Sequence, residues 1–179
     1  RRKVAAAGGR EGRPAELDGC SSSSSSESGA CNINDLIQHV AKGVLSFGVT
    51  AFCPTVITSA PDTYHRILAQ FKRVKGDRSR SEVLGLHLEG PFISEHKDGA
   101  HPAHLVREPK HGFGSVERVY GDDAALSKVD LVTMAPELKG SMDAIEGLVR
   151  KGIVVSSGHS MTSLDTALEA VDRGATMVT

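Results

Sequence analysis

Apolar residues follow two alternating periods along residues 32–179, one typical of helices and one typical of buried strands. Five short, nearly continuous apolar runs have the composition of parallel strands that are covered on both faces. These predicted strands are 49–53, 83–88, 129–134, 153–157 and 175–179. Before and between them, apolar residues recur at helical spacing. The pattern therefore predicts an α/β fold in which helices cover a parallel sheet.

Residues with strong positional preferences set the expected limits of the helices. Pro61 can open a helix that we expect to extend to Gly76, because proline fits the first helical turn and glycine often ends a helix. Ser141 is the predicted cap of a later helix. Thr162 and Asp165 resemble a capping box for the last one. Another helix is expected around 113–126.

The number of predicted strands bears on the architecture. An open, doubly wound sheet needs about five strands, whereas a closed eight-stranded barrel needs roughly 250 residues. The chain has 179 residues. The hydrophobic pattern alone therefore favours the open sheet.

The first 31 residues have a different composition. They contain several glycines and the run Ser21–Ser26, and almost nothing that is both large and apolar. Such a segment cannot bury enough surface to offset the entropy lost on ordering. We therefore predict a disordered, low-complexity segment at 1–31 and a folded domain at 32–179.

Charge and composition exclude several kinds of partner. The chain has 21 Lys and Arg against 22 Asp and Glu, so its net charge is −1 and it has no strong general field for nucleic acid or an acidic membrane. No apolar run approaches the roughly 20 residues that a membrane helix needs. Three widely spaced cysteines give no disulfide framework. A cytoplasmic protein with no nucleic-acid or membrane partner is expected.

Candidate chemistry lies at the ends of two predicted strands. In parallel α/β folds the reactive groups follow the carboxyl ends of the strands. His87 and Glu89 point to the same side at one such end, and His159 follows another. Glu and His are suitable ligands for a zinc-like ion, although a catalytic zinc normally has about three protein ligands. A solvated carboxylate and two hydrogen-bonded structural histidines remain the alternative.

The loop Lys97–His101 is a further candidate. It offers a cation, a flexible glycine and an imidazole within five residues. This composition suits closure over a small anionic or hydroxylated ligand. Loops of this composition are more often simply exposed to solvent, without a binding role.

Two motifs together resemble a known family. The run HLEGPFIS at 87–94, followed by KDGAHP at 97–102, closely resembles the signature of the N-acetylglucosamine-6-phosphate deacetylases in the amidohydrolase superfamily. Shorter matches are GVTAFCPT at 48–55, APE at 135–137 and SGHS at 157–160. The similarity runs from about residue 33 to Thr179 and is greatest to the animal members.

The resemblance implies a fold and an activity. The fold is a metal-dependent (β/α)8 TIM barrel, of which the five strands and their covering helices form part. The activity is removal of the acetyl group from N-acetylglucosamine 6-phosphate, which gives glucosamine 6-phosphate and acetate. Position by position, the resemblance makes Glu89 and His159 metal ligands and Ala100 and His101 substrate contacts. The implied ion is divalent, with zinc as its expected identity.

The resemblance also implies residues that this sequence does not contain. A further metal-ligand histidine is expected just after the last predicted strand, and a catalytic aspartate later still, so both fall beyond Thr179. We therefore expect a fragment that lacks both ends of the family's chain, holds no catalytic residue and turns over slowly or not at all. The alternative is a non-catalytic truncated chain that misfolds or pairs with a full-length partner. The expected partners are a small sugar phosphate and a second chain, in a homo-oligomer or in such a pair.

Overall fold

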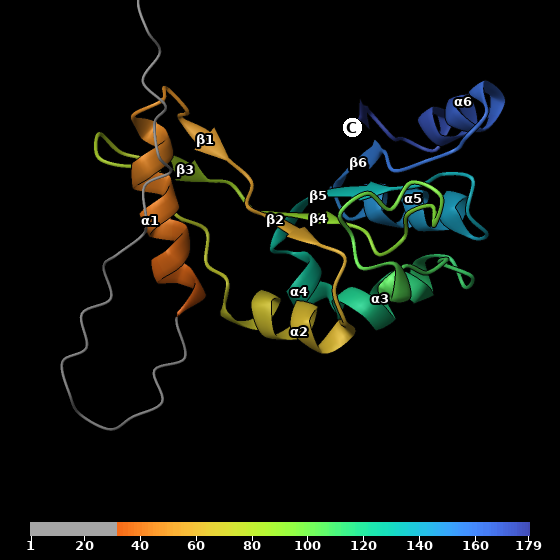
Figure 1. Cartoon of the computed structure of the whole chain (residues 1–179), viewed down its shortest axis with the longest axis horizontal. Helices are drawn as coiled ribbons and strands as arrows, with labels where there is room; N and C mark the ends of the chain where they lie inside the picture. Colours follow the sequence, from red (N-terminus) through yellow and green to blue (C-terminus); the bar gives the residue numbers. More distant parts are fainter. Residues whose placement is uncertain (1–31) are drawn as a thin grey trace, which may run out of the picture. The chain divides into compact units, whose positions relative to one another are not determined.

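The computed structural model describes residues 32–179, and the predicted disordered segment at 1–31 lies outside the described residues. The remaining chain alternates between short strands and helices (Figure 1). In order, the elements are α1 (Ile33–Leu45), β1 (Ala51–Phe52), β2 (Thr55–Ile57), α2 (Pro61–Gln70), β3 (Glu82–Val83), β4 (Leu86–Glu89), the 3-10 turn Ala103–Leu105, α3 (Phe113–Tyr120), α4 (Asp123–Leu126), β5 (Val129–Met134), α5 (Ser141–Arg150), β6 (Val154–Ser157), α6 (Leu164–Asp172) and β7 (Met177–Val178).

The main sheet has five parallel strands in chain order, β2-β4-β5-β6-β7. A doubly wound sheet reverses its strand order at a switch point and carries helices on both faces. Here the order does not reverse, and α2, α3, α5 and α6 contact one another in succession. Figure 1 shows α2, α3 and α4 on the same side of β4 and β5. The open sheet favoured by the pattern is therefore wrong, and the fold is part of a (β/α)8 barrel, as the resemblance implied.

The predicted strand 83–88 is divided into β3 and β4, and the predicted strand 49–53 is followed by a second strand, β2, that was not predicted. β1 and β3 form a separate two-stranded parallel sheet, so β2, and not the predicted strand 49–53, is the first strand of the main sheet. Pro54 separates β1 from β2, since its nitrogen has no proton to donate to a ladder. Gly85 separates β3 from β4. A Cβ at Gly85 would lie 2.5 Å from the carboxylate carbon of Asp130, so a larger residue would displace that side chain.

Two helices are shorter than the sequence predicts. α2 ends at Gln70 and not near Gly76, because Val74 leaves the helix and pairs in antiparallel fashion with Val83. The helix expected around 113–126 is divided into α3 and α4 at Gly121. Gly121 has a φ of 114°, which a helical residue cannot adopt.

Both predicted caps in the last third are shifted by one residue. Ser141 is the first residue of α5, after Gly140, and its hydroxyl donates to the carbonyl of Ala135 instead of capping the helix. Ser163, and not Thr162, caps α6 by accepting a hydrogen bond from the amide of Thr166. Several short hydroxyl-bearing residues near one helix start compete for the cap, and tertiary contacts decide among them.

Two buried tyrosines fix the point at which the chain leaves β4. The rings of Tyr64 and Tyr120 meet edge to face with centroids 5.1 Å apart. Both hydroxyls donate to the carbonyl of Gly90, at 2.8 and 2.9 Å. Gly90 has a φ of 76°, and a Cβ there would lie 2.1 Å from the Thr58 hydroxyl, so only glycine fits. Since Gly90 follows Glu89, these contacts also hold the end of β4 that carries the carboxylate.

His87 belongs to a hydrogen-bonded row across the sheet. Its Nδ1 lies 2.9 Å from the Thr55 hydroxyl and its Nε2 lies 2.8 Å from the Thr133 hydroxyl. The three residues come from β2, β4 and β5. Burial lowers the pKa of His87, and the nearby charge of Glu89 only partly opposes this shift. A hydroxyl can donate or accept, so both ring nitrogens of a neutral imidazole are satisfied here. His87 is a hydrogen-bonded structural histidine.

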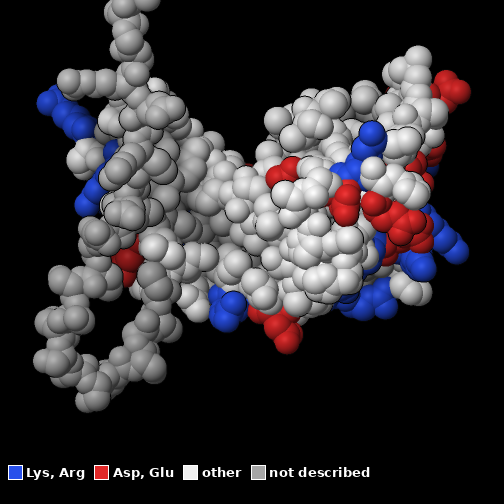
Figure 2. All heavy atoms as spheres, viewed as in Figure 1, with Lys and Arg blue, Asp and Glu red and all other residues white. Residues whose placement is uncertain are grey.

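The surface carries charges of both signs. Figure 2 shows Lys and Arg beside Asp and Glu over the right-hand part of the view. Among the helices in the described part of the chain, none combines the length and the apolar character needed to cross a bilayer.

We expect Tyr120→Phe to lower the free energy of unfolding by about 1 kcal/mol, because the ring packing is kept and one hydrogen bond to Gly90 is lost. The double variant Tyr64→Phe/Tyr120→Phe should lose more than the sum of the two single variants, because the buried carbonyl then loses both donors. Urea unfolding followed by circular dichroism measures all three. Strictly additive losses would contradict a shared role at Gly90.

Candidate functional site

Glu89 and His159 meet at one edge of the sheet, although 70 residues separate them in the chain. Glu89 is the last residue of β4, and His159 follows β6 after a single glycine. Glu89 Oε1 lies 2.9 Å from His159 Nε2. The two side chains are 18% and 24% exposed, so solvent reaches them only in part. As the sequence predicts, the ends of these two strands lie close together.

The backbone of His159 adopts an uncommon conformation. Its φ is 49°, in the left-handed region that side-chain-bearing residues seldom occupy. Its carbonyl accepts a hydrogen bond from the amide of Ser94 (2.9 Å). The amide of Gly158 donates to the carbonyl of Met134 at the end of β5 (3.2 Å). These contacts fix the direction in which the imidazole leaves the chain.

The loop Lys97–His101 determines the tautomer of His159. His159 Nδ1 lies 2.6 Å from the carbonyl oxygen of Lys97. A carbonyl only accepts, so Nδ1 donates and carries the proton of the neutral ring. Nε2 then holds a lone pair that faces the oxygen of Glu89. Two acceptors at 2.9 Å repel each other unless a proton or another cation lies between them.

His101 is the third member of the cluster and has the opposite tautomer. The amide of Thr58 donates to His101 Nδ1 (3.2 Å), and the Thr58 hydroxyl lies 2.8 Å from the same nitrogen. A backbone amide can only donate, so Nδ1 is the acceptor and Nε2 carries the proton. Burial lowers the pKa of His101, and the neighbouring His159 adds to this shift while Glu89 and Asp98 oppose it. The ring therefore offers an N–H donor at Nε2.

The three side chains could hold a metal ion. One ligand atom from each of Glu89, His101 and His159 lies within 4.8 Å of the other two. Zinc binds imidazole nitrogen and carboxylate oxygen at about 2.0–2.2 Å, so two such ligands at a tetrahedral angle are about 3.4 Å apart. The 2.9 Å pair would open only slightly to reach that separation. The donor set fits a divalent ion, and Glu89 and His159 are the members that present lone pairs to it.

The other residues of the expected site lie near this cluster. Ala100 is exposed, in a turn closed by the amide of His101, which donates to the carbonyl of Asp98 (2.9 Å). Lys97 contacts His159 through its carbonyl and not through its charged side chain. A hollow of about 620 Å³ opens beside His159. It is lined by Lys97, the residues from Ser157 to Thr162, Val178 and Thr179.

The sequence analysis gave no supporting role to three groups that hold the cluster in place. Thr58 follows β2 and orients His101. Glu137 follows β5 and contacts the residues after His159. Both come just after strands of the main sheet, which is the signal that identified Glu89. The carbonyl of Lys97 left no signal, because every residue has a carbonyl.

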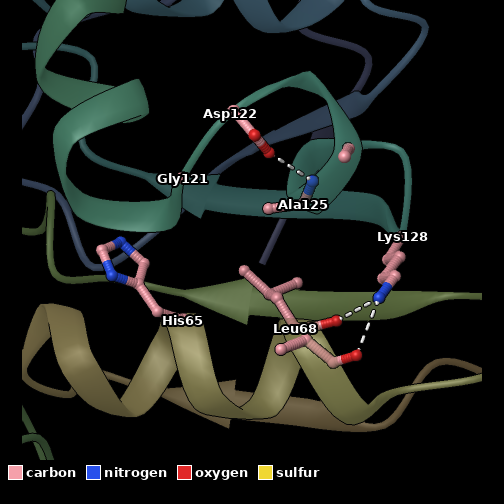
Figure 3. A pocket seen from close by; sticks show the side chains of 8 residues that line it. His65, Leu68, Gly121, Asp122, Ala125 and Lys128 are labelled. Atoms are coloured by element: carbon pink, nitrogen blue, oxygen red, sulfur yellow. Dashed lines mark hydrogen bonds between the residues drawn. The ribbon is translucent and has the colours of Figure 1, made fainter.

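A second hollow lies between α2 and α4 (Figure 3). The charged side chains that line it, Lys128 and Asp122, have structural roles. The ammonium of Lys128 donates to the carbonyls of Leu68 and Ala69 near the end of α2. Asp122 caps α4 by accepting from the amide of Ala125 (3.0 Å). These two side chains serve helix ends, as charged and polar groups at such positions commonly do.

Known proteins with similar sequences share one name. The N-acetylglucosamine-6-phosphate deacetylases of zebrafish (Danio rerio) and human are each 48% identical to this chain over 141 residues. That of Lysinibacillus sphaericus is 36% identical over 135 residues. These alignments cover 78%, 78% and 74% of this chain. No family model matches the chain.

Solved structures give the same result. The N-acetylglucosamine-6-phosphate deacetylase of Pasteurella multocida superimposes with a TM-score of 0.58 over 80% of this chain and 35% of its own, at 27% identity. A variant of the Mycobacterium smegmatis enzyme, solved in complex with N-acetyl-D-glucosamine-6-phosphate, gives a TM-score of 0.56 over 72% of this chain and 32% of its own, at 31% identity.

The extent of the match limits what it shows. The chain spans about one third of the length of the curated relatives it matches, 34% for the zebrafish and human proteins and 33% for the bacterial one. Within that third, sequence and structure agree. Over that third, the chain is similar in sequence and in structure to the N-acetylglucosamine-6-phosphate deacetylases.

Proposed function

We propose that this chain forms the metal-binding part of an enzyme that hydrolyses the acetamide of N-acetylglucosamine 6-phosphate, giving glucosamine 6-phosphate and acetate. The observation that carries the proposal is the convergence of one ligand atom each from Glu89, His101 and His159 within 4.8 Å, with His159 Nε2 2.9 Å from the carboxylate of Glu89. The names of the relatives supply the substrate, and the Mycobacterium smegmatis structure was solved with that sugar phosphate bound.

In this proposal, Glu89 and His159 are ligands of a divalent ion, and zinc is the ion that the mixed oxygen and nitrogen donors suit. A bound ion of this kind polarises an amide carbonyl and lowers the pKa of water. The carbonyl of Lys97 keeps His159 in the tautomer that can bind it. Such outer contacts commonly fix the orientation of a ligating histidine.

His101 has a different role from the two ligands. Its proton lies on Nε2, so it can donate a hydrogen bond to an oxygen of the sugar substrate. Ala100, exposed in the same turn, contacts the substrate beside it. This division of roles follows from the two tautomers, since one ring presents a lone pair and the other an N–H.

Metal binding gives the most direct test. We expect the 179-residue chain to bind one zinc ion, as measured by isothermal titration calorimetry. Glu89→Gln and His159→Asn should each weaken binding by more than the roughly 10–100-fold that loss of an outer contact costs. His101→Asn should weaken it by less than about tenfold, because His101 is a donor and not a ligand in this proposal.

Glu146→Gln, on α5, is the matched control and should bind zinc as the unaltered chain does. A loss in His101→Asn as large as that in Glu89→Gln would contradict the role given to His101 and make it a third ligand. Absence of zinc binding in the unaltered chain would overturn the proposal.

Turnover is a separate test. For the 179 residues alone we expect acetate release from N-acetylglucosamine 6-phosphate to be slow or absent even with zinc, because the resemblance assigns the proton-transferring aspartate to a position outside them. Loss of one member of a catalytic group commonly costs many orders of magnitude in rate. Acetate detection with and without zinc measures this. Zinc-dependent turnover at an ordinary enzymatic rate would show that these residues suffice.

A second role, pairing with another chain, is favoured by one feature. Leu164, Leu168 and Val178 on α6 and β7 are 74%, 53% and 84% exposed. Large apolar side chains gathered at one edge are typical of an interaction surface. We propose that this edge pairs with a second chain, either a copy of this one or a longer relative.

Light scattering during size-exclusion chromatography tests the pairing. We expect self-association that rises with concentration and falls in Leu164→Lys/Leu168→Lys, because a charge at the edge opposes burial. Ala124→Lys, on the exposed surface of α4, is the control. A monodisperse monomer at every concentration would count against pairing between copies.

A further inference from the structure

Glu137 lies outside the cluster of Glu89, His101 and His159, yet both of its carboxylate oxygens contact the residues that follow His159. Oε2 accepts a hydrogen bond from the Ser160 hydroxyl (2.6 Å), and Oε1 accepts one from the amide of Met161 (2.6 Å). The Ser160 hydroxyl in turn accepts from the amide of Thr162 (2.9 Å). Glu137 therefore holds the two residues after the histidine directly, and Thr162 is bound to the first of them.

The conformation of His159 needs this support. A φ of 49° is unfavourable for a residue with a side chain, and such residues persist only where their surroundings hold them. On the amino-terminal side, Gly158 is bound to Met134 at the end of β5 (3.2 Å). On the other side, Ser160 and Met161 are bound to Glu137, three residues further along the same segment. The segment that ends β5 therefore holds the chain on both sides of His159.

We propose that Glu137 is a positioning residue for His159. By fixing Ser160 and Met161 it keeps the left-handed backbone of His159, and so it directs Nε2 towards Glu89. The part of this inference that concerns metal affinity rests on the proposed function. The part that concerns the conformation of the loop does not depend on the proposed function.

A carboxylate suits these contacts because both of its oxygens accept. Both partners donate to Glu137, one through an amide and one through a hydroxyl. A glutamine offers one acceptor oxygen and one NH2 group, which only donates. Its NH2 would oppose the amide of Met161 or would deprive the Ser160 hydroxyl of its acceptor. Glu137→Gln therefore keeps the size of the side chain, removes its charge, and either loses the Met161 contact or reverses the direction of the Ser160 contact.

The first measurement is amide hydrogen exchange of the 179-residue chain without added metal. We expect the amides of Met161 and Ser94 to exchange at least about tenfold faster in Glu137→Gln, because Ser94 donates to the carbonyl of His159. The buried amide of Val132 in β5 should keep its protection. Glu146→Gln, which removes an equally long carboxylate that pairs with Arg150 and Arg173 on the surface, should change none of the three.

The second measurement is zinc affinity by calorimetry. Glu137→Gln should weaken binding by about 10–100-fold, as expected for loss of a group that orients a ligand. Ser160→Ala removes only the hydroxyl contact, so it should shift both measurements in the same direction by a smaller factor. The unfolding midpoint in urea should stay close to that of the unaltered chain for both variants.

The outcomes are distinct. Unchanged exchange at Met161 and Ser94 in Glu137→Gln overturns the inference, whatever the zinc result. Loss of cooperative unfolding in both Glu137→Gln and Ser160→Ala also overturns it, because the role would then be general folding. If the unaltered chain binds no zinc, the proposed function fails, and the exchange measurement alone decides the positioning role.

Discussion

His159 Nε2 and Glu89 Oε1 face each other across the end of the sheet, and the rest of the site depends on this pair, in which both atoms are hydrogen-bond acceptors when the ring is neutral. His159 Nε2 lies 2.9 Å from Glu89 Oε1, and the carbonyl of Lys97 holds the ring proton on the other nitrogen. Electrostatic repulsion between such groups is strong where solvent is partly excluded. A cation relieves it. The arrangement therefore stores a preference for positive charge at one point, which is the central requirement of a metal site.

Several contacts away from the pair keep it in this geometry. The hydroxyls of Tyr64 and Tyr120 hold Gly90 and thus the end of β4 on one side. On the other side, the segment after β5 holds the backbone around His159. Beneath the pair, His87 joins β4 to its two neighbouring strands through Thr55 and Thr133. The tyrosine and His87 contacts are buried or partly buried, so the packed sheet helps to shape the site.

The sequence predicted the convergence of Glu89 and His159 because strand-end polar residues are a local signal and parallel strands end at a common edge. It predicted the strand and helix alternation for the same local reasons. It did not predict the shift of the first sheet strand to β2, since the effect of Pro54 depends on which strand pairs with β4. The opposite tautomers of His101 and His159 also could not be predicted. They are set by the amide of Thr58 and the carbonyl of Lys97, main-chain groups that carry no sequence signature.

The contact between Glu89 and His159 joins two points that are 70 residues apart in the chain. An unfolded chain would have to close a loop of that length to bring them together, at a substantial cost in entropy. An ion that binds both side chains would therefore bind the native state far better than the denatured state. By mass action, such an ion would raise the stability of every strand and helix between them. Loss of the ion would then remove this added stability together with the chemistry that the ion supplies.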